Sequence, residues 1–136
     1  MSPGSPAPPD PQPGWRRRGI FWLVYLAVWT VLLLMPIPGG ALSGLPWLAG
    51  WKFTFAKTLH VTAYAVLAML GGWMRVPCRF RWLLLFLIMV HGTGTELLQL
   101  NIPTRTGDVR DVGLDNLGVA LGLLLTWKWW ASPDPI

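Results

Sequence analysis

The sequence predicts an all-α membrane protein, a bundle of four transmembrane helices with both termini cytoplasmic. Of the 136 residues, 53% are hydrophobic and 12% are charged, whereas a soluble domain carries about 25% charged residues. The mean hydropathy is +0.46. Four apolar stretches each approach the roughly 20 residues that a membrane-spanning helix needs.

The first apolar stretch follows a segment rich in Pro, Gly and Ser, which is expected to be a disordered tail. This stretch could be a signal peptide, but its length of about 16 residues exceeds the usual 7 to 15 and favours a retained helix. The sequence PIPGG ends it, because Pro and Gly stop helices. We expect three regions: a tail over 1–15, a single four-helix domain over 16–131, and a C-terminal tail over 132–136.

The four helices of this domain are each bounded by loop-forming or basic segments. The third and fourth are separated by a short polar loop that contains Pro103 and Arg105. We find no internal repeat. The expected helices are 19–36, 53–74, 81–100 and 110–130.

The Lys and Arg residues flank the apolar stretches unevenly, which is the positive-inside pattern of membrane proteins. The net charge of +5 therefore does not indicate a nucleic-acid partner. The single cysteine, Cys78, excludes a disulfide framework. Lys52, Lys57, Arg105 and Arg110 fall on the side that we expect to face outward. The side that we expect to face the cytoplasm holds Arg16, Arg17, Arg18, Arg75, Arg79, Arg81 and Lys128.

Most of the remaining ionisable groups fall at the outer ends of the helices. An ionised group inside a bilayer costs at least about 2.5 kcal/mol, so such groups are rare and usually paired or functional. At about 100° per residue, each set below shares one helix face. The sets are Lys57, His60 and Tyr64; Glu96 and Gln99; and Asp111 and Asp115, with Arg105 in the loop between the last two sets.

The acidic face of the fourth helix also carries Gly118 and Gly122. Small residues four apart mark faces where membrane helices pack closely, so this face is expected to point into the bundle. A polar cluster at this depth can be an architectural network, or it can give His60 a role in acid–base catalysis. His91, Asp108 and Arg110 are expected to lie outside it.

The same residues carry a resemblance to a known family. The motifs are K-x2-H-x3-Y from Lys57, E-x2-Q from Glu96, P-x-R ending at Arg105, and D-x3-D-x2-G-x3-G from Asp111. In this order and spacing they resemble the VanZ family of small bacterial membrane proteins, over most of residues 53–125. The family has Asn where this chain has Asp115. Either Asp replaces it, which helical facing favours, or Asn116 serves instead.

The resemblance implies a protein of the bacterial inner membrane, linked to the cell envelope and to teicoplanin resistance. The family has been grouped with membrane enzymes that process lipid headgroups, which implies phosphoester chemistry outside the cytoplasm. Such chemistry needs a cation for the phosphate, an acid–base group and often a divalent metal. No local carboxylate motif here demands a metal. The expected catalytic residues are His60, Glu96 and Asp111, and the expected substrate-binding residues are Lys57, Tyr64, Gln99, Arg105 and Asp115.

Three functions are therefore open. The first is an enzyme that hydrolyses or exchanges a phosphate-linked lipid headgroup. The second is a non-catalytic module that binds lipid-linked envelope precursors or glycopeptides. The third is a small transporter or structural subunit, which the lack of an internal repeat disfavours.

Overall fold

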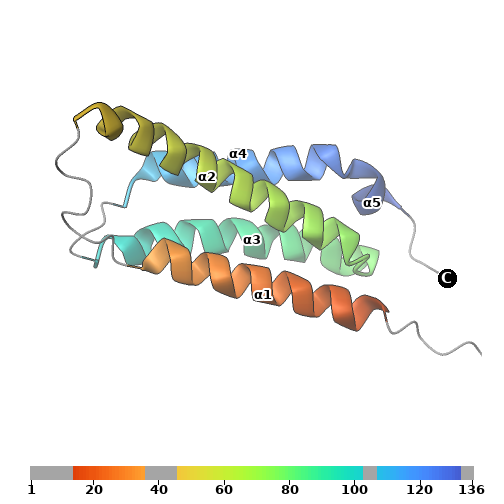
Figure 1. Cartoon of the computed structure of the whole chain (residues 1–136). Coiled ribbons are helices and arrows are strands. Elements are labelled where there is room, and N and C mark those ends of the chain that lie inside the picture. Colours follow the sequence, from red (N-terminus) through yellow and green to blue (C-terminus); the bar gives the residue numbers. More distant parts are fainter. Residues whose placement is uncertain (1–13, 36–45, 103–106, 133–136) are drawn as a thin grey trace, which may run out of the picture.

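The chain folds into four long helices that lie side by side, followed by one short helix (Figure 1). A computed structural model describes residues 14–35, 46–102 and 107–132, and these contain no strand. The all-α prediction is therefore confirmed for the described residues. The helices are α1 (Gly14–Leu34), α2 (Pro46–Trp73), α3 (Cys78–Gln99), α4 (Val109–Leu125) and α5 (Trp127–Ala131).

Consecutive helices run in opposite directions, so their ends gather into two groups (Figure 1). The beginning of α1, the turn between α2 and α3, and α5 lie at one end, which we call the basic end. The end of α3 and the beginnings of α2 and α4 lie at the other end, which we call the polar end.

The fourth helix differs from its expected range of 110–130. It ends at Leu125, and Thr126 leaves the helical conformation with φ −116° and ψ 22°. The Thr126 hydroxyl donates to the Gly122 carbonyl at 2.6 Å, and the Thr126 carbonyl accepts from the Trp129 N–H at 2.8 Å. A continuous helix over 110–130 was therefore wrong, because a threonine hydroxyl that bonds back to the main chain competes with helix propagation.

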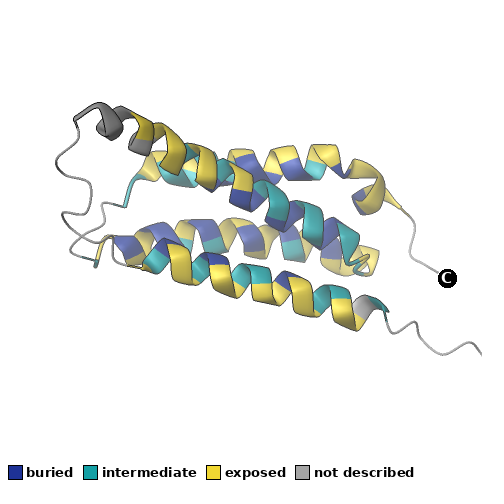
Figure 2. Ribbon diagram, viewed as in Figure 1, coloured by how far each residue is buried: buried dark blue, intermediate teal, exposed yellow. Residues whose placement is uncertain are grey.

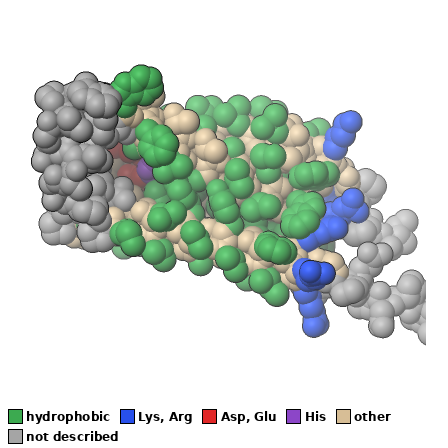
Figure 3. Space-filling model, in the orientation of Figure 1, with side chains coloured by type: hydrophobic (Ala, Val, Ile, Leu, Met, Phe, Trp, Pro, Cys, Tyr) green, Lys and Arg blue, Asp and Glu red, His purple; other side chains and the backbone are tan. Residues whose placement is uncertain are grey.

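The outward faces of the helices are apolar, and the inward faces form the core (Figure 2). Hydrophobic side chains cover most of the visible surface between the two ends (Figure 3). Two described helices are long and apolar enough to cross a membrane: Arg16–Leu34 with mean hydropathy 1.5 and Cys78–Gln99 with 1.3. With 17 residues, α4 spans about 26 Å at 1.5 Å per residue, slightly less than the roughly 30 Å of a hydrocarbon core.

α2 and α4 approach each other most closely, through two glycines of α4. A Cβ atom at Gly118 would meet the Val61 carbonyl oxygen and the Tyr64 Cβ. A Cβ atom at Gly122 would meet the Ala65 carbonyl oxygen and the Ala68 Cβ. The prediction that the small-residue face of the fourth helix packs into the bundle is confirmed, and this contact fixes how α4 is rotated.

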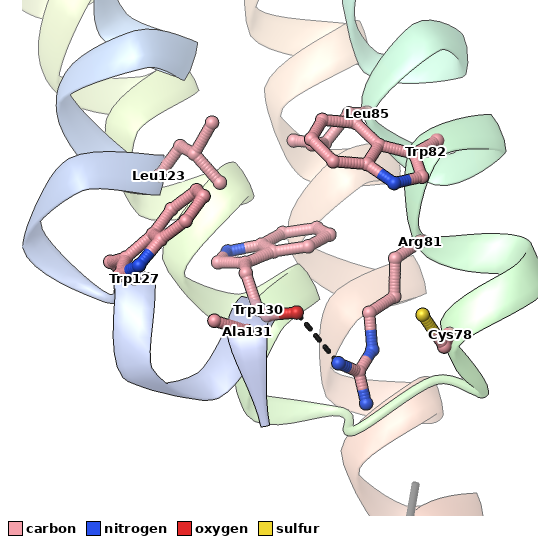
Figure 4. A pocket seen from close by; sticks show the side chains of 8 residues that line it. All are labelled: Cys78, Arg81, Trp82, Leu85, Leu123, Trp127, Trp130 and Ala131. Atoms are coloured by element: carbon pink, nitrogen blue, oxygen red, sulfur yellow. Dashed lines mark hydrogen bonds between the residues drawn. The ribbon is translucent and has the colours of Figure 1, made fainter. Parts of the chain in front are cut away.

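Lys and Arg side chains gather at the basic end (Figure 3). Arg81 lies at this end but is buried, with only 5% of its surface exposed. Its guanidinium donates to the carbonyls of Val76 at 2.8 Å, Trp130 at 2.6 Å and Ser132. It lines a cavity of about 190 Å³ together with Cys78 and three tryptophans (Figure 4). Arg81 therefore lies at the end where we expected it, and its buried guanidinium ties α5 to α3.

Candidate functional site

Three helices bring His60, Glu96 and Asp115 together at the polar end. His60 comes from α2, Glu96 from α3 and Asp115 from α4. They are 7%, 4% and 2% exposed, respectively. We call these three residues the trio.

Within the trio, one imidazole nitrogen lies near both carboxylates. His60 Nδ1 is 2.9 Å from Asp115 Oδ1 and 3.9 Å from Glu96 Oε1. One ligand atom from each of the three side chains lies within 4.8 Å of the others. Glu96 Oε1 and Asp115 Oδ2 are buried and have no hydrogen-bond partner among the described residues.

Gly92 of α3 has no side chain, and this leaves space for the Asp115 side chain. A Cβ atom there would lie 3.2 Å from Asp115 Cβ and Oδ2. The ring of Trp29 in α1 is nearly perpendicular to the His60 ring, with centroids 6.4 Å apart and an interplanar angle of 80°. No sequence pattern predicts this position for Trp29, since it is one of ten tryptophans in an apolar chain.

Lys57 forms a second polar group beside the trio, with one carboxylate of α4 and the carboxylate of its N-cap residue. Its ammonium contacts Asp111, and it lies 3.4 Å from Asp108 Oδ2. Among the carboxylates of α4, Asp115 and not Asp111 hydrogen-bonds to His60. The structure thus pairs Asp111, an expected catalytic residue, with Lys57.

Asp108 connects the two groups, although we expected it to lie outside the site. Its side chain contacts Lys57, and its backbone N–H donates to Glu96 Oε2 at 3.0 Å. It is also the N-cap of α4, where it accepts from the Arg110 N–H at 2.9 Å. A sequence signal for this existed, because Asp108, Asp111 and Asp115 share the i, i+3, i+7 spacing of one helix face.

The other residues expected outside the site lie apart from the trio. The Arg110 side chain is exposed. His91 belongs to a chain of hydrogen bonds deeper in the bundle: Thr30 Oγ1 is 2.8 Å from His91 Nε2, and His91 Nδ1 is 3.0 Å from the Tyr64 hydroxyl. Since Thr30 donates its own proton to the Leu26 carbonyl, His91 Nε2 is the donor to Thr30, and Tyr64 donates to His91 Nδ1.

The remaining expected site residues differ in their placement. Tyr64 is fully buried and shares its hydroxyl with His91 and Thr95. The Gln99 amide donates to the Leu33 carbonyl at 3.0 Å and so joins α3 to the end of α1. Arg105 lies outside the described residues. Roles of these three residues in substrate binding stay predictions.

Asp115, and not its neighbour Asn116, contributes the α4 carboxylate of the trio. Its carboxylate lies at the contact of α2, α3 and α4, whereas the Asn116 side chain is half-buried and its Oδ1 has no hydrogen-bond partner among the described residues. Of these two neighbouring residues, Asp115 is therefore the one at the contact of the three helices. A carboxylate there adds a negative charge that an amide would not.

A scan against models of known protein families, a search of the curated proteins and a search of the solved structures each found no match to this chain.

The charge of Asp108 is expected to make stability depend on pH at the polar end. The Arg110 backbone N–H and the Lys57 ammonium hold the pKa of the Asp108 carboxyl below its ordinary value. A lowered folded-state pKa stabilises the protein above the unfolded pKa of about 3.9, and this stabilisation is lost as the pH falls through the folded value. Asp108→Asn keeps a good N-cap and removes the charge.

The measurement is the thermal unfolding temperature of wild type and Asp108→Asn in detergent, between pH 3 and pH 7. Wild type should be the more stable at pH 6, and the difference should shrink below pH 4. A constant difference over the whole range would show that the Asp108 charge does not contribute.

Proposed function

We propose that this protein is a membrane enzyme that hydrolyses or exchanges a phosphate-linked lipid headgroup at the membrane–water interface. The observation that carries the proposal is the trio. A buried imidazole lies 2.9 Å from one carboxylate and 3.9 Å from another, and a lysine lies one turn away in the same helix. The resemblance of the motifs to the VanZ family adds to it.

The shape and charge of the bundle support a location of the site at the outer surface of the membrane. Two helices apolar enough to cross a membrane and the apolar outer surface (Figure 3) support a bundle that spans the bilayer. The Lys and Arg side chains at the basic end support a cytoplasmic position for that end. The trio then faces the extracytoplasmic side of the inner membrane, at the depth where lipid phosphates lie.

The trio can activate the oxygen that attacks the phosphorus atom. The proton of a water or of a lipid hydroxyl can leave to the His60 imidazole, which Asp115 orients, or the oxygen can be activated by an ion that the three side chains hold. The new P–O bond forms as the bond to the leaving alcohol breaks, and the alcohol takes up a proton. Lys57 and Arg105 would hold the phosphate oxygens.

The test is turnover by the purified protein in vesicles that contain a panel of phospholipids and polyprenyl-linked precursors. His60→Ala and Glu96→Ala should each lower the rate by about 100- to 10,000-fold, the range of positioned acid–base groups. Arg110→Gln, an exposed residue of the same end, is the matched control and should retain the wild-type rate. Turnover that neither alanine variant changes would remove the proposed roles.

A second candidate is a non-catalytic module that binds lipid-linked precursors or glycopeptides. The observation that favours it is the pairing of Lys57 with Asp108 and Asp111, because paired charges form a rigid recognition surface. It predicts saturable binding of the same lipids without turnover. Product formation that depends on His60 decides against it.

A further inference from the structure

We infer that His60, Glu96 and Asp115 bind a divalent metal ion of the zinc type. The inference rests on the proposed function in that it concerns the same site, and it names the cofactor of that site. Four observations of the structure carry it: the donor atoms, their spacing, their unused oxygens and the charge balance.

The donor set and its spacing suit such an ion. Imidazole nitrogen and carboxylate oxygen are ligands that zinc takes in proteins, at about 2.0–2.2 Å. Two donors on a tetrahedral ion then lie about 3.4 Å apart. His60 Nδ1 lies 2.9 Å from Asp115 Oδ1 and 3.9 Å from Glu96 Oε1, which brackets this separation. The ion would take the place of the proton shared by His60 and Asp115.

The unused oxygens point to a missing partner. Glu96 Oε1 and Asp115 Oδ2 are buried without a hydrogen-bond partner among the described residues, on side chains that are 4% and 2% exposed. A buried polar atom left unpaired costs about 1–3 kcal/mol, so native proteins rarely leave two within one cluster. A metal ion at this point would use both carboxylates.

Charge balance favours a divalent ion over a proton on the imidazole. The trio holds two carboxylates, and a protonated His60 would neutralise only one of them. Lys57 already contacts Asp108 and Asp111, so its charge is shared with a different pair. Buried charges are expensive unless they are paired or coordinate a metal, and one divalent ion balances both carboxylates.

Three protein ligands leave one position of a tetrahedral ion open. Catalytic zinc sites have this arrangement, with water in the fourth position, whereas structural sites use four protein ligands. Such an ion would supply a bound water of lowered pKa, which is about 7 in known zinc sites. His60 would then act as a ligand, and the metal-bound water would supply the oxygen that attacks the phosphorus atom.

The outer contacts of Glu96 would hold its carboxylate in place for the ion. Glu96 Oε2 accepts from the Asp108 N–H at 3.0 Å, which leaves Oε1 directed toward His60. Partners that orient a ligand in this way typically contribute about 10- to 100-fold to metal affinity. Here the partner is a backbone N–H, so Asp108→Asn preserves it.

The test measures metal binding alone, on full-length protein purified in detergent without a histidine tag. Chelator-stripped wild type is titrated with Zn²⁺ and, separately, with Co²⁺, and the bound metal is measured by mass spectrometry after gel filtration. We expect one ion per chain. Glu96→Gln and Asp115→Asn, which keep side-chain size, should bind at least about 100-fold more weakly, since loss of an orienting partner alone costs about 10- to 100-fold. Arg110→Gln, an exposed residue outside the trio, should bind as wild type does.

The Co²⁺ absorption spectrum of wild type gives a second readout that needs no variant. Bands of a four-coordinate ion with nitrogen and oxygen ligands, reversed by chelator, would support the site if a variant fails to fold. Wild type that takes up no stoichiometric ion from micromolar Zn²⁺, or isosteric variants that bind as tightly as wild type, would overturn the inference. Metal binding without lipid turnover would overturn the proposed function alone, and turnover by metal-free protein would overturn this inference alone.

Discussion

Replacing His60 with leucine is expected to lower the free energy of unfolding by about 3–5 kcal/mol, the cost of removing one partner of a buried ion pair. His60 is the nearest partner of the buried Asp115 carboxylate. Leucine fills a similar volume, but it neither donates a hydrogen bond nor carries a charge. The variant therefore leaves two carboxylates buried at the contact of three helices.

The measurement is unfolding of the purified protein in mixed micelles, with chelator present so that loss of an ion does not contribute. Thr62→Leu, an exposed position two residues further along α2, is the control and should change stability little. Adding Asp115→Leu to His60→Leu should recover part of the loss, because an apolar pair removes the unpaired charge. If His60→Leu is as stable as Thr62→Leu, the trio does not contribute to the fold.

Replacing Gly122 with leucine is expected to cost about 3 kcal/mol or more, the upper end of the range for overpacking. A side chain at this position meets the backbone carbonyl of Ala65 as well as the Ala68 Cβ. A helix backbone cannot turn aside as a flexible side chain does, so α2 and α4 must separate. Separation would also move Asp115, two turns earlier in α4, away from His60.

Gly113→Leu in the same helix is the matched control, because a Cβ atom there meets nothing within 4 Å. Unfolding in mixed micelles compares the two variants directly. We expect Gly113→Leu to stay within about 0.5 kcal/mol of wild type, as surface substitutions usually do. Equal stability of the two leucine variants would contradict the close contact of α2 with α4.

The two predictions test different links between structure and function. The glycine contact fixes the rotation of α4, and the trio depends on that rotation. A variant that loosens the contact should therefore lower metal binding and turnover together with stability. Glu96→Gln should lower metal binding and turnover while the α2–α4 contact remains intact.

The sequence was sufficient to predict that polar residues converge. Helical spacing placed His60 on the same face as Lys57, and Asp115 on the same face as Gly118. Alternating helix directions then brought these faces to one end of the bundle. Glu96 joined them because it lies near the end of α3, which the short loop to α4 keeps close to the beginning of α4.

The sequence was not sufficient to predict which charges pair. Asp111 and Asp115 both lie on the inward face of α4. The relative shift of α2 and α4 along their axes decides that Asp111 pairs with Lys57 and Asp115 with His60. The i, i+3, i+7 spacing places Asp108 on the face of Asp111 and Asp115, but its contact with Glu96 uses a backbone N–H, a donor that every residue except proline has. The contact of Arg81 with α5 also depends on the tertiary structure, because the break at Thr126 brings the Trp130 carbonyl toward it.

By itself, the sequence determined the helical class, the order of the long helices and the end of the bundle at which the polar groups lie. These properties follow from hydrophobic stretches and from a period of 3.6 residues, which are local along the chain. Only the tertiary structure decided that His60, Glu96 and Asp115 form one group with Lys57 beside it. Partner choice depends on how far each helix is rotated and shifted against its neighbours, and the close contact at Gly118 and Gly122 sets both.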